Sequence, residues 1–400
     1  MPTRSLVWTL AATCGACVPY SPAPADPAAV AATVRARPGG TFTRTQAAAL
    51  ALHQNATLQA LEARVRAAGA VTVPLELAGE WRSESDMIAL MLDPVALLGQ
   101  GARGASLNVV DAAAAAAADE LATARWQVAA AVAEAFAVDA ALRDATPPNV
   151  TVDLEAFARA GLAAPVALAR VRAATTRAAA EQVEIEAERA RNRSALAELL
   201  GLAPDATIAF AAEHAQLPTP PREERALLRR PDVVLAAARF ALADAEFADA
   251  VAAQYPALMV GPELPLVGGS LAAMATLRLP LGAHGLAVAA RERREAARAE
   301  LTAQWLAASR DAHDTAIEAD AAAARERAAQ AAATASREDL HSAQVALLVD
   351  ADPDAFARLA DAAAMAVRDD SEARAAAVVL ARAHVRAAVA AGWPRVEEAP

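Results

Sequence analysis

The segment ALLRRPDVVLAAARFALADAEFADAVAAQYPAL, residues 226–258, reads as a long helix that ends at a Tyr-Pro pair. A similar helical pattern, TQAAALALHQNATLQALEARVRAAG, starts at Thr45. The two align with a constant offset: Leu52 falls on Leu227, Leu58 on Val233 and Arg64 on Arg239. Each copy continues into two short extended runs and then into long helices. Two copies with one order of elements predict an internal two-fold repeat, and their uneven spacing indicates an old duplication.

The repeat divides the chain into segments. We expect the first structural repeat at residues 45–215 and the second at 216–392, each with a helix, a β-hairpin and a long helical hairpin. The expected β-hairpins span about 71–95 and 257–281, and the helical hairpins turn near 161 and 352. A signal peptide at 1–17, an extended N-terminal segment at 18–44 and a tail at 393–400 complete the chain.

The extended runs predict four short strands. Apolar and polar residues alternate in VTVPLELAGEW (71–81) and in SLAAMATLRLPL (270–281), as in strands with one apolar face. Their partner strands alternate poorly, and Pro262 and Pro265 would cost hydrogen bonds in an interior strand. Four strands cannot close a barrel, and an open edge in lipid leaves backbone groups unpaired. Either the hairpins lie on a helical core, or several chains pool their strands into a barrel of about eight or more.

Composition favours long, closely packed helices. Hydrophobic residues make up 56% of the chain but aromatic residues only 4%, and alanine, the strongest helix former, supplies most of the difference. The helix expected from Gly104 to about Leu142 would be roughly 60 Å long. The fold class is therefore mainly α with a small β part, built from long antiparallel helices.

The charge and hydropathy of the chain exclude some classes of protein. The sequence contains no lysine, its net charge is −11, and no basic stripe with interleaved aromatic residues occurs, which argues against a nucleic-acid-binding protein. No apolar run reaches the ~20 residues of a membrane-spanning helix.

The N-terminus, MPTRSLVWTLAATCGACVPYSP, has the pattern of an export signal: Arg4, a short apolar core, then small residues. Both cysteines, Cys14 and Cys17, lie here, so a disulfide framework is excluded. Gly15 and Ala16 predict Cys17 as the acceptor of a lipid. The alternative is an ordinary signal, either cleaved or retained.

A dinucleotide-binding fingerprint occurs at Gly99-x-Gly101-x-x-Gly104. Such a site requires a preceding strand and a continuing series of strands and helices. Asp93-Pro94 interrupts the required strand, and no such series follows. We therefore interpret these glycines as a flexible joint between a strand and a long helix.

Several motifs, in order, resemble the TolC-like outer membrane efflux proteins, especially their lipoprotein branch, over nearly the whole chain. They are CVPYSPAPADPAA (17–29) at the processed start, FARAGLAAPVALARVRAA (157–174) at a helical tip, ALAELLGLAPD (195–205) at the end of the first copy, the Arg-Pro-Asp helix of residues 226–258, LRLPLGAHG (277–285) after the last strand, and AGWP (391–394) at the end of the second copy. In that family LLGQGARG (97–104) would be the joint from strand to helix.

The resemblance implies a homotrimer in the outer membrane, anchored by lipid and extended into the periplasm. Three chains would form a twelve-stranded β-barrel, continued by an α-helical barrel of coiled-coil-like packing. Its closed end would meet a periplasmic adaptor protein and an inner-membrane transporter, which supplies the energy for passive export through the duct. The alternative is a periplasmic helical lipoprotein scaffold whose hairpins form no pore.

The resemblance also assigns candidate sites. Gly161, Leu162 and Ala163 would form the tip that contacts the adaptor. The second tip reads VDADPDAFARL in place of the family's glycine, and Asp350, Asp352 and Asp354 would form an acidic ring at the aperture or simply begin a helix. Glu76, Glu80 and Arg278, on the polar faces of the strands, are candidate pore-lining residues.

No catalytic or metal site is predicted. The six histidines show no metal-ligand spacing, and no nucleophile motif occurs, so we expect neither an enzyme nor a cofactor. The paired carboxylates Asp369-Asp370 are interpreted as part of a solvated helix face.

Overall fold

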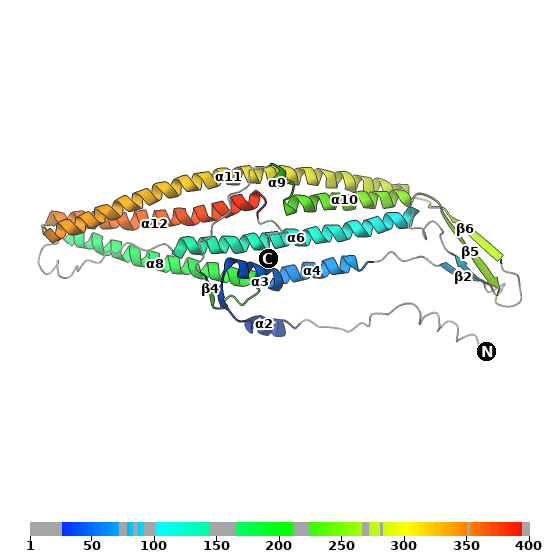
Figure 1. The fold of residues 1–400 in the computed structure, drawn as a ribbon, viewed down its shortest axis with the longest axis horizontal. Helices are drawn as coiled ribbons and strands as arrows, with labels where there is room; N and C mark the ends of the chain where they lie inside the picture. Colours follow the sequence, from blue (N-terminus) through cyan, green and yellow to red (C-terminus); the bar gives the residue numbers. More distant parts are fainter. Residues whose placement is uncertain are drawn as a thin grey trace.

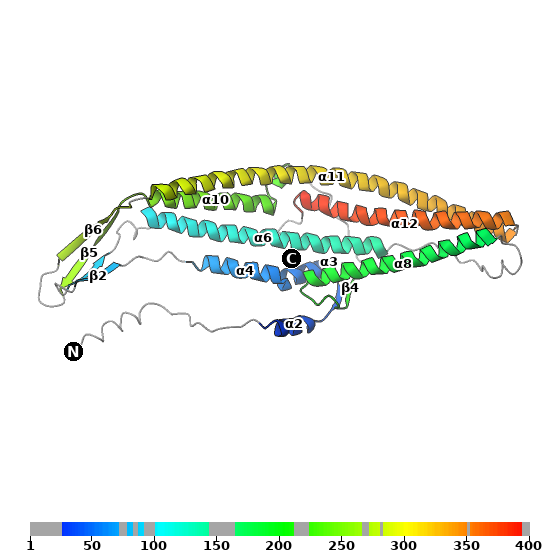
Figure 2. The same cartoon turned by 180° about the vertical axis from the view of Figure 1, so that it is seen from behind.

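The computed structural model describes residues 26–71, 78–82, 87–91, 101–143, 165–211, 224–265, 272–280, 283–349 and 353–393. The molecule is elongated: long helices lie side by side along its axis, and a small sheet lies at one end (Figures 1 and 2). The mainly α fold with a small β part, expected from the sequence, is confirmed.

The elements follow one another in an order that occurs twice. The helices are α2 (Pro27–Arg35), α3 (Arg44–Gln54), α4 (Ala56–Gly69), α6 (Gly101–Arg143), α8 (Pro165–Leu199), α9 (Glu224–Leu227), α10 (Pro231–Ala252), α11 (His284–Val349) and α12 (Pro353–Ala390); the strands are β1 (Gly40–Phe42), β2 (Ala78–Arg82), β3 (Met87–Met91), β4 (Ile208–Phe210), β5 (Ala257–Pro265) and β6 (Ala272–Arg278). Helix α4, hairpin β2–β3, long helix α6 and returning helix α8 are followed by α10, hairpin β5–β6, α11 and α12.

The long helices form a layer. α10 packs between α6 and α11, α12 packs against α11, α8 and α6, and α4 packs against α6. Many of the buried contacts are alanine on alanine; Ala319 and Ala322 of α11, for example, meet Ala383 and Ala387 of α12. Alanine permits this close approach of helix backbones. Larger side chains fill the layer near the start of α12, where Phe356, Leu359 and Val171 are fully buried.

The four longer strands form one antiparallel sheet in the order β2-β3-β5-β6. Both expected hairpins are present, and β3 and β5 join them through three register pairs, from Met87↔Pro265 to Ala89↔Glu263. β5 is an interior strand of this sheet although it contains Pro262 and Pro265.

The glycines expected to form a flexible joint lie partly inside a helix. α6 begins at Gly101 and includes Gly104, so the helix starts three residues earlier than expected. Gly99 lies outside the described residues.

Two expectations about the N-terminal part were wrong. Residues 27–35, expected to be extended, form helix α2, because the Asp26 side chain accepts a hydrogen bond from Ala28 N (2.9 Å), Pro27 occupies the first turn and alanines follow. The helix expected to run unbroken from Thr45 is divided at Asn55. The Asn55 Oδ1 accepts hydrogen bonds from Thr57 N and Leu58 N, which starts a new helix at Ala56.

A second, two-stranded sheet lies beside the middle of the layer. β1 pairs with β4 in parallel, with Gly40 opposite Ile208. The loop that leads into β4 follows Gly201, whose φ of 65° ends helix α8, as is typical of a glycine just after a helix. Gly392 plays the same part after α12, with a φ of 93°.

Gly201→Ala should destabilise the protein. A Cβ at this position would lie 2.6 Å from the Gln54 carbonyl oxygen, and the left-handed backbone adds strain, so we expect a loss of about 2 kcal/mol or more in the free energy of unfolding. Gly285→Ala is the matched control, because a Cβ there meets nothing within 4 Å in helix α11. Chemical denaturation followed by circular dichroism measures both. Equal midpoints for the two variants would contradict this account of the helix end.

Candidate functional site

One face of the larger sheet is apolar and exposed to solvent. Leu258 lies opposite Leu277 in the register, and Val260 opposite Ala275, so these residues share a face. Leu277 is 58% exposed and Leu258 47%. The register places positions 81, 88 and 264 on the same side. An exposed apolar surface of this kind marks contact with an apolar partner or with lipid. We call it the apolar face of the sheet.

The other face carries the candidate pore-lining positions. The register places positions 80 and 278 on this side, together with Thr276, which is exposed. Glu76 lies outside the described residues. The strand pairing therefore brings positions 80 and 278, from two different hairpins, to one side of the sheet.

A buried arginine joins the helices near the middle of the layer. Arg230 precedes Pro231, the first residue of α10, and is only 5% exposed. Its guanidinium donates to both carboxylate oxygens of Asp232 (3.1 and 2.7 Å), to Asp311 Oδ2 of α11 (3.0 Å) and to Ala390 O, the last residue of α12 (2.9 Å). Burial lowers the pKa of the Arg230 guanidinium, but its hydrogen bonds and ion pairs with Asp232 and Asp311 raise the net pKa above its ordinary value.

Two tryptophans complete this Arg230 cluster. The guanidinium of Arg230 lies 5.6 Å from the ring centroid of Trp126 of α6. Trp126 Nε1 donates to the carbonyl oxygen of Trp393, just beyond α12 (3.0 Å), and Arg44 of α3 lies over the Trp393 ring. The cluster therefore connects α3, α6, α10, α11 and the end of α12. The sequence marked the Arg-Pro-Asp motif, but its partners from α6, α11 and α12 are distant in sequence and carried no recognisable signal.

The first copy has a corresponding contact. Asn55 stands at the start of α4 as Arg230 stands at the start of α10, and its Nδ2 donates to Leu199 O at the end of α8 (3.2 Å). Gly201 follows Leu199 at the same spacing as Gly392 follows Ala390. In each copy, a side chain at the start of the first helix holds the last carbonyl of the returning helix.

A second charged cluster lies within the helical layer. Asp370 of α12 is 1% exposed and pairs with Arg337 of α11 (Nη2–Oδ1 2.7 Å), while Arg374 of α12 pairs with Glu181 of α8. Burial raises the pKa of Asp370, the charges of Arg337 and Arg374 oppose this shift, and Glu181 adds to it. We call these four residues the Asp370 cluster.

The interpretation of Asp369-Asp370 as a solvated face was wrong for Asp370. The buried residues of α12 recur at helical spacing, and Asp370 follows Ala363, Ala366 and Val367 on that stripe. This spacing was present in the sequence and could have identified Asp370 as buried.

Most of the sequence-predicted site residues fall outside the described residues. These are Glu76, the lipid acceptor Cys17, the tip residues Gly161, Leu162 and Ala163, and the acidic residues Asp350 and Asp352. Asp354 is described: it is exposed in the first turn of α12, which begins at Pro353.

Among the described residues, no cluster of histidine, cysteine and acidic side chains could hold a metal ion. None of the described helices combines the length and the apolar character needed to cross a membrane.

Comparison with known proteins identifies the fold. No protein-family model and no curated protein matches the sequence. Among solved structures, the outer-membrane channel OprN is similar (TM-score 0.69, 19% identity, 87% of this chain and 89% of that chain). So is CusC, whose structures describe transmembrane channel formation (TM-score 0.69, 16% identity, 87% and 92% covered).

The open state of the MtrE outer membrane channel of Neisseria gonorrhoeae is also similar (TM-score 0.67, 16% identity, 87% of this chain and 88% of that chain). The chain therefore has the fold of outer membrane channels. For the single chain, the mainly α fold with a small β part that the sequence resemblance implied is confirmed.

Arg230→Met should lower the free energy of unfolding by about 3 kcal/mol, because it leaves Asp232 and Ala390 O without their buried partner. Arg229→Met is the matched control: Arg229 is exposed, and its loss should change the free energy by less than about 0.5 kcal/mol. Urea denaturation of both variants measures the difference. Similar losses for the two variants would show that the buried contacts of Arg230 contribute little.

Asp370→Asn should make stability less dependent on pH. Because burial raises the pKa of Asp370 in the folded protein, the folded state binds a proton more readily than the unfolded chain, and the carboxylate costs stability above that pKa. We expect Asp370→Asn to be more stable than the parent at neutral pH, and this advantage to shrink as the pH falls towards the ordinary value of 3.8.

Asp369→Asn, at the neighbouring partly buried position, is the matched control for the loss of one carboxylate. Melting temperatures of the three proteins between neutral and acidic pH provide the test. A constant difference between Asp370→Asn and the parent across that range would refute the assignment.

Proposed function

We propose that the chain is the outer membrane channel of a tripartite efflux system, through which substrates from an inner-membrane pump pass passively to the exterior. The observation that carries this proposal is the apolar face of the sheet. It is exposed at the end of an elongated helical layer, and no helix or strand that the structure describes covers it (Figure 1). A chain with the fold of outer membrane channels would place this face against lipid.

The strand order supports assembly into a homotrimer. β2 and β6 are the edge strands of the sheet, and no other described strand lies beside either of them. In lipid, every backbone N–H and C=O group has to be paired within the protein, so the sheet has to close. Pairing of β6 with β2 of the next chain is a head-to-tail contact that generates a ring. Three chains would supply twelve strands, above the about eight of the smallest membrane barrels.

The helical layer supports the same closure. Ala308 and Ala319 of α11 are buried within the layer, whereas Leu306 and Ile317, two positions earlier and therefore about 200° around the helix, are exposed. α8 repeats this arrangement with Ile185 buried and Val183 exposed. Both helices thus carry apolar residues on two opposite sides. A neighbouring chain on each side would cover them and close the helices into a tunnel.

The remaining sites follow from this arrangement. Glu76, Glu80 and Arg278 would face the lumen, Cys17 would carry a lipid anchor in the outer membrane, and the two copies would derive from a duplication. The helical tips, with Gly161, Leu162 and Ala163 in one and Asp350, Asp352 and Asp354 in the other, would meet a periplasmic adaptor. The exposed position of Asp354 at the start of α12 leaves it accessible for this contact.

Electron microscopy of the protein purified from membranes in detergent tests the proposal. We expect hollow, three-fold symmetric cylinders roughly 100 Å long or longer, allowing ~1.5 Å per helical residue for the 66 residues of α11 together with the sheet. The same particles should conduct ions after reconstitution into planar bilayers. Small particles without symmetry or conductance would instead favour a periplasmic scaffold.

Leu277→Arg should impair membrane insertion, because it places a charge on the apolar face of the sheet at a cost of about 2–4 kcal/mol near the middle of a bilayer. Thr276→Arg, one position away on the other face, should insert normally and alter only conductance. Fractionation of outer membranes followed by native electrophoresis measures both. Normal insertion of both variants would exclude contact between this face and lipid.

A further inference from the structure

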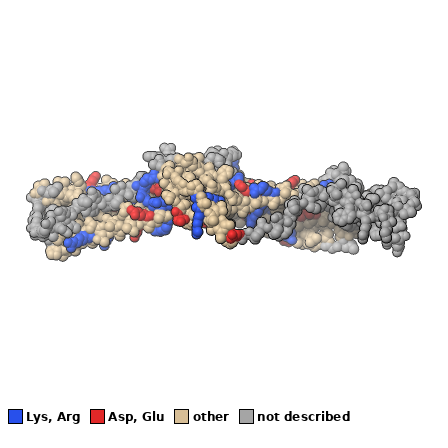
Figure 3. Space-filling view, turned by 90° about the horizontal axis from the view of Figure 1, so that it is seen from below, with Lys and Arg blue, Asp and Glu red and all other residues tan. Residues whose placement is uncertain are grey.

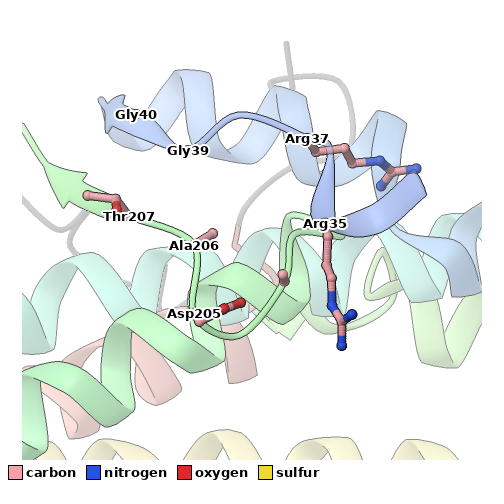
Figure 4. A pocket seen from close by; sticks show the side chains of 8 residues that line it. Arg35, Arg37, Gly39, Gly40, Asp205, Ala206 and Thr207 are labelled. Atoms are coloured by element: carbon pink, nitrogen blue, oxygen red, sulfur yellow. The ribbon is translucent and has the colours of Figure 1, made fainter. Parts of the chain in front are cut away.

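A cavity of about 490 Å³ lies beside the middle of the helical layer. One wall is the segment that leads from α2 into β1, and the other is the loop between α8 and β4 (Figure 4). Its lining residues are Arg35, Arg37, Gly39, Gly40, Ala203, Asp205, Ala206 and Thr207. We call it the waist cavity.

The walls of the waist cavity are held together by specific contacts. Arg37 Nη1 donates to Gly201 O at the end of α8 (2.7 Å), which ties the N-terminal segment to the loop. Gly39 approaches the loop so closely that a Cβ would lie 2.1 Å from Thr207 O. The parallel pairing of Gly40 with Ile208 continues this contact. The cavity is therefore fixed by side-chain, backbone and strand contacts at once.

Two opposite charges lie at the cavity and do not neutralise each other. Arg35 comes from the end of α2 and Asp205 from the facing loop, and both are exposed (Figure 4). Neither side chain forms a hydrogen bond or ion pair with any residue that the structure describes. A guanidinium binds a carboxylate, and a carboxylate binds an ammonium group, through charge-assisted hydrogen bonds.

We propose that the waist cavity binds a free amino acid or a short peptide, a ligand that carries both a carboxylate and an amine. The carboxylate would lie on Arg35 and the amine on Asp205. A volume of about 490 Å³ is within the range of ligand sites, about 300–1,000 Å³, and accommodates one or two amino-acid residues. The proposed ligand neutralises both charges at once, which a simple anion or cation cannot do.

The position of the cavity identifies where such a ligand would come from. α2 and the two-stranded sheet of β1 and β4 project from one side of the helical layer (Figure 1), and both basic and acidic side chains lie around this middle part of the molecule (Figure 3). A layer that closes into a ring has more room on its outer side, so this projection would face outwards. This step rests on the proposed function, which places the outer surface in the periplasm. There the free peptide ends of the cell wall, or soluble peptides, would meet the cavity.

Binding of small peptides to the full-length protein in detergent tests the proposal. The probes are the dipeptide Ala-Ala, its N-acetylated form, which lacks the amine, and its C-terminal amide, which lacks the carboxylate. Arg35→Gln should weaken Ala-Ala binding about tenfold but leave binding of the amide nearly unchanged. Asp205→Asn should weaken Ala-Ala similarly but leave the acetylated form nearly unchanged. Arg239→Gln, an exposed arginine of α10, is the matched control and should bind all three probes as the parent does.

Sedimentation with purified cell-wall sacculi distinguishes the two sources of the ligand. Co-sedimentation that is lost in Arg35→Gln and Asp205→Asn but kept in Arg239→Gln identifies wall-borne peptides. Binding of Ala-Ala without co-sedimentation identifies soluble peptides. Equal binding of Ala-Ala by the parent, Arg35→Gln and Asp205→Asn, or no binding of dipeptide or sacculi by the parent, would overturn the proposal.

Conductance of the same preparations separates this inference from the proposed function. A conducting trimer that binds none of these probes would refute the waist cavity as a peptide site and leave the channel intact. Peptide binding by a protein that neither conducts nor forms trimers would keep the site and refute the channel.

Discussion

A layer one helix thick cannot bury both sides of the helices at its borders. α11 is 66 residues long and carries apolar residues on opposite sides, yet within one chain it packs mainly against α10 and α12. The sheet has a similar problem. β2 and β6 are its outer strands, and no described strand of the same chain lies beside them to accept or donate backbone hydrogen bonds. Alanine, which dominates the contacts, contributes little buried area per residue, so this layer depends on close packing and, in the proposed trimer, on contacts with neighbouring chains.

The ends of the returning helices are stabilised in two chemically different ways. Asn55 both accepts from the first N–H groups of α4 and donates to Leu199 O, because its amide has an acceptor and a donor. At the equivalent position, Pro231 has already removed one N–H group from the start of α10, so a donor-only residue is tolerated. Arg230 is long enough to reach Ala390 O and Asp311 as well. The length of the Arg230 side chain explains why the Arg230 cluster connects five elements.

Periodicity made the long helices and both hairpins predictable, and Gly201 marked a helix end. The features that the sequence analysis missed depend either on single capping side chains or on contacts between distant residues. Helix α2 depended on the cap at Asp26, and the break at Asn55 on a side chain able to start a new helix. The pairing of β1 with β4, the partners of Arg230 and the waist cavity join residues far apart in sequence, which no local pattern encodes. Most candidate tip residues fall outside the described residues.

The two hairpins of the sheet are far apart in sequence, and β3 and β5 join them. The described pairs of this junction run from Met87↔Pro265 to Ala89↔Glu263. Each hairpin needs only a short loop to close, but the junction between them closes across all the residues from β3 to β5, at a much larger entropic cost. We therefore expect an order of folding in which hairpins form early and locally, and the sheet is completed late, after the long helices have brought its two halves together.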